Sequence, residues 1–150
     1  MASRLTRDDV ARTLNMNEAS CNELVVREAE SARAALAAFI RNLDAEEFDW
    51  RPDDGISSAR DWVGSVIADE SRRREAFGGT RRKAGRGAGV PTSPAACADL
   101  LRSERAATLE ALAGKPASST MLALLLADTR AMTGVVGLQR LIDPSRVLPV

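Results

Sequence analysis

Apolar residues recur at intervals of three and four in four separate stretches of this chain, and this periodicity is the strongest constraint on its fold. In the first stretch, Val25, Ala29, Leu36 and Leu43 share one face of a helix that starts near Ser20. No stretch alternates apolar and polar residues over the length of a strand with enrichment in β-branched residues. The pattern therefore predicts an all-α protein.

Capping and helix-breaking residues mark the limits of the other three helices. Ser58 and Asp61 have the spacing of a capping box, and Pro94 follows Ser93 as a favoured first helical residue. The expected helices run from Ser58 to Phe77, from Ser93 to Gly114, and from Ser118 or Ser119 to Asp143. The last is the most apolar, so we expect it to be the most buried.

Four helices with one apolar face each bury those faces most simply in a four-helix bundle. We expect an up-down bundle with one long connection, formed by a basic glycine-rich loop at residues 78–92 that crosses one end. A short leading helix over Thr6–Leu14 belongs to the first 18 residues. A chain of 150 residues has the size of one domain, and no internal repeat is evident.

Composition excludes several function classes. Apolar residues make up 45% of the chain, but the longest apolar run, Met121–Ala127, is too short to span a bilayer. The N-terminus is too charged for a signal peptide, so we expect a cytoplasmic protein without membrane contact. Basic and acidic residues balance at 21 each and aromatic residues are few, which disfavours nucleic acid as a partner.

The loop at residues 78–92 and the two cysteines each have two readings. The loop and the residues before it carry seven cations, which indicate either a solvated loop or an anion-binding segment. These are Arg72, Arg73, Arg74, Arg81, Arg82, Lys83 and Arg86. Cys21 and Cys97 are expected to be reduced structural residues rather than a disulfide.

The segment "FDWRPDDGISSARDWVGSVIADE" resembles the DinB/YfiT-like superfamily of bacterial four-helix bundles. Members of that family share a Trp-x-Pro segment, a glycine, a Ser-capped helix with an acidic residue three positions on, and then Gly-His. Trp50, Pro52, Gly55, Ser58, Asp61 and Gly64 fit this spacing. The resemblance implies the bundle fold and a pocket between the second and fourth long helices.

The chain contains no histidine, whereas the family's metal site uses three. The resemblance places Ser65, Thr129 and Thr133 at those ligand positions, and neutral hydroxyls are poor substitutes for imidazole. We therefore expect no metal and no cofactor. The thiol-dependent chemistry of the family relies on a metal, so its mechanism does not transfer directly.

Polar groups near the implied pocket supply the candidate site. Glu70 and Asp128 each stand on a largely apolar helix face, where an unpaired carboxylate is costly. One reading pairs each with a nearby cation such as Arg73, Arg74 or Arg130. The other makes Glu70 and Asp128 a catalytic pair that face each other across the pocket, one of them with a raised pKa.

The expected ligand-binding residues are the ones that the family resemblance and the helical periodicity place around the pocket. They are Trp50, Trp62, Ser65, Thr129, Met132 and Thr133. The resulting prediction is a metal-free protein that binds a small organic molecule, of stress or self-resistance type, with hydrolase or isomerase activity left open. The alternative is a non-catalytic structural or interaction module, a homodimer, whose ancestral site has decayed.

Overall fold

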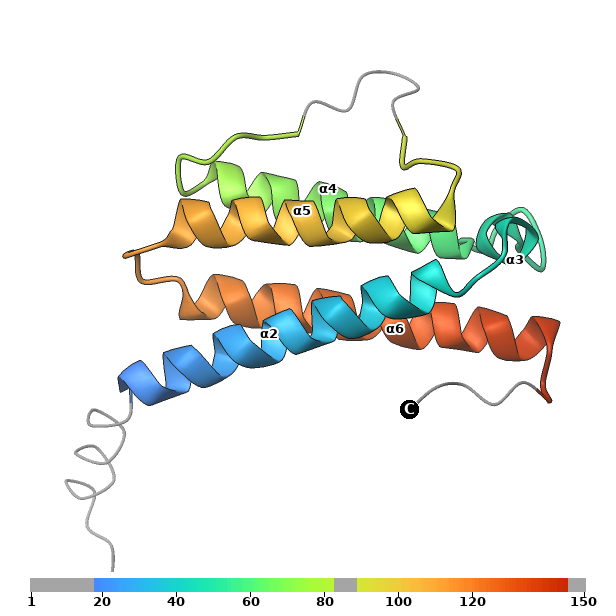
Figure 1. Ribbon diagram of the computed structural model, residues 1–150, viewed down its shortest axis with the longest axis horizontal. Coiled ribbons are helices and arrows are strands. Elements are labelled where there is room, and N and C mark those ends of the chain that lie inside the picture. Colours follow the sequence, from blue (N-terminus) through green and yellow to red (C-terminus); the bar gives the residue numbers. More distant parts are fainter. Residues whose placement is uncertain (1–17, 83–88, 146–150) are drawn as a thin grey trace, which may run out of the picture.

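The computed structural model describes residues 18–82 and 89–145, and within these ranges the secondary structure is helical (Figure 1). The helices are α2 (Glu18–Arg41), α3 (Ala45–Asp49), α4 (Ala59–Glu75), α5 (Pro94–Leu112) and α6 (Ser118–Ile142). The prediction of an all-α protein is confirmed for this part of the chain. The expected leading helix over Thr6–Leu14 lies outside the described residues.

Local side-chain hydrogen bonds explain where the helices start. The Ser58 hydroxyl accepts from the Asp61 amide, and the Asp61 carboxylate accepts from the Ser58 amide, so the predicted capping box at α4 is confirmed. These hydrogen bonds lower the pKa of Asp61. Ser93 caps α5 and Pro94 is its first residue, as predicted. α5 ends just before Gly114, which adopts a positive φ of 73°.

The short helix α3 was not anticipated from the sequence. Asp44 and Glu47 form a second capping box, with each side chain accepting from the other residue's amide. The turn that follows buries Phe48 completely. The capping pattern "DAEE" was available as a signal, but the Pro52 and Gly55 that follow it suggested only a loop.

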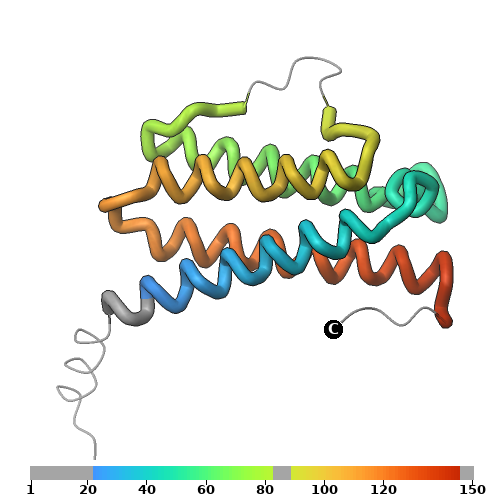
Figure 2. The backbone as a smooth tube through the Cα atoms, in the orientation of Figure 1, coloured from blue at the N-terminus to red at the C-terminus, as the bar shows by residue number. Residues whose placement is uncertain are grey.

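The four long helices stand at the corners of a square. α2 packs against α5 and α6, and α4 packs against the same two helices. Figures 1 and 2 show that α2 and α6 run in one direction and α4 and α5 in the other. The start of α5 therefore lies at the opposite end from the end of α4, and the connection between them spans the length of the helices. The expected course over one end is wrong.

The core runs along the inside of the square. Its main cluster joins α2, α3, α4, α5 and α6 through residues such as Leu36, Phe48, Val63, Leu101 and Val135. α6 is long and apolar enough to pass a length-and-composition test for a membrane span, as core helices of soluble proteins also do, and 33% of the tested window is buried.

The prediction that α6 is the most buried helix is wrong. It contains seven buried residues, as many as the shorter helices α4 and α5. Large apolar side chains remain on its outer side, with Leu122 46% and Leu126 57% exposed. These leucines give α6 its high hydropathy without contributing to the core.

α4 and α6 approach each other closely where Trp62 crosses Gly134. A Cβ added at Gly134 would lie 2.5 Å from Cε2 of the Trp62 indole and 2.8 Å from its Cζ2. Such separations are too short for carbon atoms, so the indole occupies space that only glycine leaves open. A Cβ at Gly137, one turn further along α6, would have no heavy atom within 4 Å.

We predict that Gly134→Ala destabilises the protein by about 1–3 kcal/mol relative to Gly137→Ala, because overpacking displaces the indole. Both substitutions raise helix propensity by a similar amount, up to about 1 kcal/mol, so the second is a matched control. Urea unfolding of the two variants measures the difference. Equal free energies of unfolding would show that Trp62 does not need this glycine.

Candidate functional site

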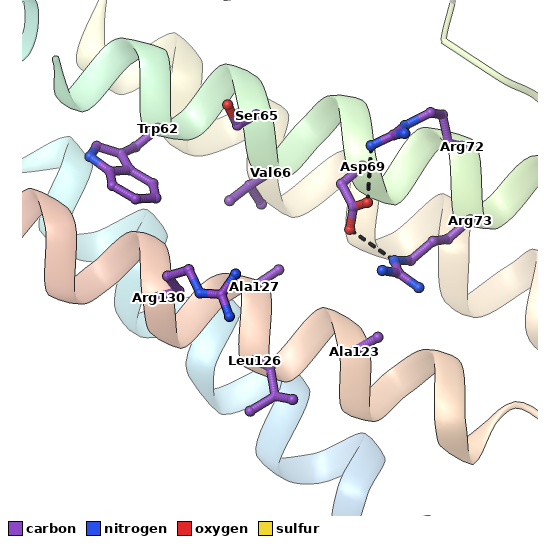
Figure 3. A pocket seen from close by; sticks show the side chains of 10 residues that line it. All are labelled: Trp62, Ser65, Val66, Asp69, Arg72, Arg73, Ala123, Leu126, Ala127 and Arg130. Atoms are coloured by element: carbon purple, nitrogen blue, oxygen red, sulfur yellow. Dashed lines mark hydrogen bonds and ion pairs between the residues drawn. The ribbon is translucent and has the colours of Figure 1, made fainter. Parts of the chain in front are cut away.

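A groove with a volume of about 440 Å³ lies between α4 and α6 (Figure 3). From α4 it is lined by Trp62, Ser65, Val66, Asp69, Arg72 and Arg73, and from α6 by Ala123, Leu126, Ala127 and Arg130. Half of these ten lining residues are apolar and half are polar or charged, and the volume lies in the range of small-molecule sites.

The three arginines that line the groove differ in whether an acidic side chain neutralises them. The Asp69 carboxylate accepts from Arg72 at 3.2 Å and from Nε of Arg73 at 2.8 Å. Arg130 forms no hydrogen bond or ion pair with any residue in the described part of the chain. Figure 3 shows its side chain extending from α6 into the space between the two helices. The groove therefore carries three guanidinium groups and one carboxylate.

Two of the six predicted ligand-binding residues line this groove, namely Trp62 and Ser65. Thr129 and Thr133 are exposed, and their hydroxyls donate to the carbonyls of Leu125 and Thr129 in their own helix. The other two residues lie elsewhere. Met132 packs against the core, and Trp50 is partly buried at the end of α3.

The predicted catalytic pair, Glu70 and Asp128, lies inside the protein rather than in the groove. Both carboxylates are completely buried, and both contact Arg33 of α2 and Arg105 of α5. Each long helix thus contributes one charged residue to a central cluster, which we call the ion-pair network: Arg33, Glu70, Arg105 and Asp128. The groups that compensate the carboxylates are not Arg73, Arg74 or Arg130.

The hydrogen bonds of the network leave no carboxylate oxygen without a partner. Arg33 donates to both oxygens of Asp128, at 3.0 Å and 2.9 Å, and to Oε2 of Glu70. Arg105 donates to Oε1 of Glu70 and to Oδ2 of Asp128, each at 2.9 Å. Two positive and two negative side chains neutralise each other, which is the condition for burying them.

This environment contradicts the raised pKa that an acid–base role for Glu70 requires. Burial by itself would raise the pKa of Glu70, but the charges of Arg33 and Arg105 outweigh it and lower that pKa. The pKa of Arg33 is correspondingly raised by Glu70 and Asp128 against the effect of its burial. Glu70 is therefore ionised at neutral pH and enclosed, and it is not available to exchange protons with a bound molecule.

The network has the symmetry of a twofold rotation that exchanges α2 with α5 and α4 with α6. Arg33 donates to the carbonyl of Leu101, four residues before Arg105, and Arg105 donates to the carbonyl of Ala29, four residues before Arg33. Arg33 donates through Nε to Asp128 and through Nη2 to Glu70, whereas Arg105 donates through Nε to Glu70 and through Nη2 to Asp128. The hydrogen bonds of the network thus follow the same pattern in the two pairs of helices.

The same register extends along the helices. It pairs buried residues of α2 with buried residues of α5, as in Leu36 with Thr108 and Ile40 with Leu112. It likewise pairs α4 with α6 in Val63 with Met121, Val66 with Leu124 and Glu70 with Asp128. Few of these paired residues are identical, which agrees with the absence of an evident repeat in the sequence.

Several cations at and after the end of α4 have structural roles. Arg74 is buried and donates to the Glu104 carboxylate at 2.8 Å and to the carbonyl of Thr80 at 2.8 Å. Arg81 and Arg82 pair with Glu75 and Glu104, at 3.4 Å and 3.7 Å. Lys83 and Arg86 lie outside the described residues. The cations described here are thus mostly compensated by acidic partners.

Cys97 has the structural role predicted for it. Its side chain is fully buried in α5, and its thiol lies 3.2 Å from the carbonyl oxygen of Pro91. Burial raises the pKa of the Cys97 thiol to about 11. The thiolate is the reactive form of cysteine, so this group is not a nucleophile at neutral pH. The side chain of Cys21 lies outside the described residues.

The residues at the family's metal-ligand positions do not fit a metal. Ser65 lies in the groove, whereas the Thr129 and Thr133 hydroxyls are held by backbone carbonyls of α6. Within residues 18–82 and 89–145, no three or more His, Cys, Asp or Glu side chains form a group that could hold a metal ion. The chemistry of this donor set therefore supports no step through a metal.

Comparison with known proteins finds no similar protein. No family model matches the chain, and no curated protein and no solved structure is significantly similar to it.

We predict that Glu70→Gln lowers the free energy of unfolding by about 3–5 kcal/mol, because it leaves a buried arginine charge uncompensated. Replacing all four network residues together by apolar ones, as Arg33→Met, Glu70→Met, Arg105→Met and Asp128→Leu, is expected to be far less costly than the single change. Urea unfolding at pH 7 compares the two variants. A single substitution that costs less than the fourfold one would contradict this account.

The network also predicts a direction of pH dependence. Because the pKa of Glu70 is below its ordinary value of 4.5, the unfolded state takes up a proton before the folded state does as the pH falls. The contribution of Glu70 is therefore complete above pH 4.5 and is lost as the pH falls through its lowered pKa. The free energy of unfolding of the wild type should decrease more steeply on acidification than that of the fourfold apolar variant.

Proposed function

We propose that this protein is a metal-free, DinB-like four-helix bundle that binds a small organic molecule in the α4–α6 groove, in a role of stress resistance or self-resistance. The observation that carries the proposal is the groove itself. It offers about 440 Å³, an indole wall from Trp62, a hydroxyl from Ser65 and an uncompensated cation at Arg130. Binding sites for small molecules combine these same kinds of group.

The proposal favours binding over turnover. The two carboxylates considered as acid and base are enclosed in the ion-pair network, and the remaining acid in the groove, Asp69, already accepts from two arginines. Ser65 has no histidine to activate it as a nucleophile, since the chain has none. The DinB-like assignment rests on the "FDWRPDDGISSARDWVGSVIADE" pattern and on the packing of four long helices.

Exposed leucines on α6 favour a second candidate, a non-catalytic interaction module that forms a homodimer. Leu122 and Leu126 stand one turn apart on the outer side of α6, and Leu141 is 64% exposed further along. Exposed apolar side chains that gather on one helix face are typical of contact surfaces. Sedimentation equilibrium tests this candidate, for which we expect a dimer that Leu126→Glu dissociates. A monomeric wild type would contradict it.

We predict that Ser65→Trp abolishes stabilisation of the protein by any small molecule that binds the groove. A ligand that binds only the folded state raises the melting temperature, by about 2.7 kcal/mol of added stability at one hundred times its Kd. Ser65 is exposed, so filling the groove at this position leaves the core intact. A thermal-shift screen of organic acids, amines and neutral compounds against wild type and variant makes the comparison.

Ala106→Trp is the matched control. Ala106 is an exposed residue of α5 and lies on the opposite side of the molecule, between α2 and α5. The control variant should respond to the same compounds as the wild type. Compounds that stabilise the wild type and Ser65→Trp equally would bind elsewhere, and the groove would then lose its proposed function.

A further inference from the structure

A comparison of α4 with α6, in the register that matches Glu70 with Asp128, shows what Arg130 lacks. Arg72 of α4 and Arg130 of α6 are equivalent positions, and both line the groove. Three residues before Arg72 stands Asp69, which accepts its hydrogen bond at 3.2 Å. Ala127 stands three residues before Arg130, and its methyl side chain cannot accept a hydrogen bond. Arg72 on the α4 side of the groove therefore has a counter-ion, whereas Arg130 on the α6 side has none among the described residues.

The surroundings of Arg130 suit an anion that carries an apolar part. Its neighbours in the lining of α6 are Leu126 and Ala127, and Trp62 and Val66 face them from α4 (Figure 3). A guanidinium offers two parallel N–H donors that match a carboxylate, and apolar neighbours limit the access of competing water. Trp62 supplies a flat apolar surface for the remainder of a ligand.

Trp62 is also held in place. Its indole lies against Gly134 with no space for a Cβ between them, so the distance between the aromatic wall and α6 is set by packing. Arg130 stands one helical turn before Gly134 on α6. Arg130 and the residue that contacts the indole therefore lie on neighbouring turns of α6, and both Arg130 and Trp62 line the groove.

We infer that the ligand of the groove is an amphiphilic organic anion, with its carboxylate bound by Arg130 and its apolar body against Trp62 and Val66. This inference rests on the proposed function of the groove and specifies the class of molecule. A free aromatic acid and a short fatty acid share this chemistry. The experiment below distinguishes between them.

The test measures binding of two acids and their uncharged amides by isothermal titration calorimetry. The probes are 2-naphthoate with 2-naphthamide, and octanoate with octanamide. The wild type should bind at least one acid about 10-fold or more tightly than its amide, as expected for a hydrogen-bonded charge pair. Tighter binding of naphthoate indicates an aromatic ligand, and tighter binding of octanoate indicates an acyl chain.

Arg130→Gln should remove this preference and bind acid and amide equally. Arg130 is exposed and forms no hydrogen bond or ion pair with another residue of the described ranges, so the variant is expected to fold with an unchanged melting temperature. Arg140→Gln, an exposed arginine of α6 outside the groove, should have no effect.

Two outcomes would overturn the inference. If acids and amides bind the wild type equally, or Arg130→Gln retains the preference, the groove does not select anions through Arg130. That result leaves the proposed function standing, because binding that Ser65→Trp abolishes still places a small molecule in the groove. Binding of none of the four probes also overturns the anion inference, whereas the proposed function is judged separately by the response of Ser65→Trp in the thermal-shift screen.

Discussion

The requirement that every buried charge be paired determines how the four long helices fit together. Arg33, Glu70, Arg105 and Asp128 come from four different helices, and all four are buried. A shift of any one helix by a single residue would turn its charged side chain out of the network and leave its partners uncompensated, at a cost of several kcal/mol. Apolar contacts tolerate such shifts far better. The network therefore specifies the register of the helices, even though apolar residues of the same volume would serve stability equally well.

The network also determines which residues reach the groove. Successive residues of an α-helix point about 100° apart, so inward-facing Glu70 and Asp128 place the residues before them, Asp69 and Ala127, on the α4–α6 surface. The same rotation carries Arg72 and Arg130 to the rim. Trp62 and Gly134 then set the separation of the two helices. A binding surface thus follows from the placement of buried charges, although none of those charges takes part in binding.

Local signals in the sequence were sufficient for the four long helices, but not for α3 or for the network. Ser58 with Asp61 and Ser93 with Pro94 act within one turn, so their roles can be predicted from adjacent residues. The unusual position of Glu70 on an apolar face was also visible, but its partners are 37 and 35 residues away. Reasoning from proximity selected Arg73 and Arg74 instead. Of the predicted ligand-binding residues, Trp62 and Ser65 of α4 line the groove, whereas Thr129 and Thr133 do not, because the register of α6 had no local anchor.

Corresponding positions of the paired helices differ more along the groove than within the ion-pair network. Some equivalent buried positions carry similar side chains, as in Arg33 with Arg105, Val66 with Leu124 and Glu70 with Asp128. They differ along the groove, where Asp69 corresponds to Ala127 and Ser65 to Ala123. A fully symmetric groove would have an acid beside each rim arginine and no net preference for either end of a ligand. Because α6 has no acid at the position of Asp69, Arg130 is uncompensated beside Trp62 and Val66. The groove therefore differs in charge between its α4 and α6 sides, and a ligand with one charged end would bind in one orientation.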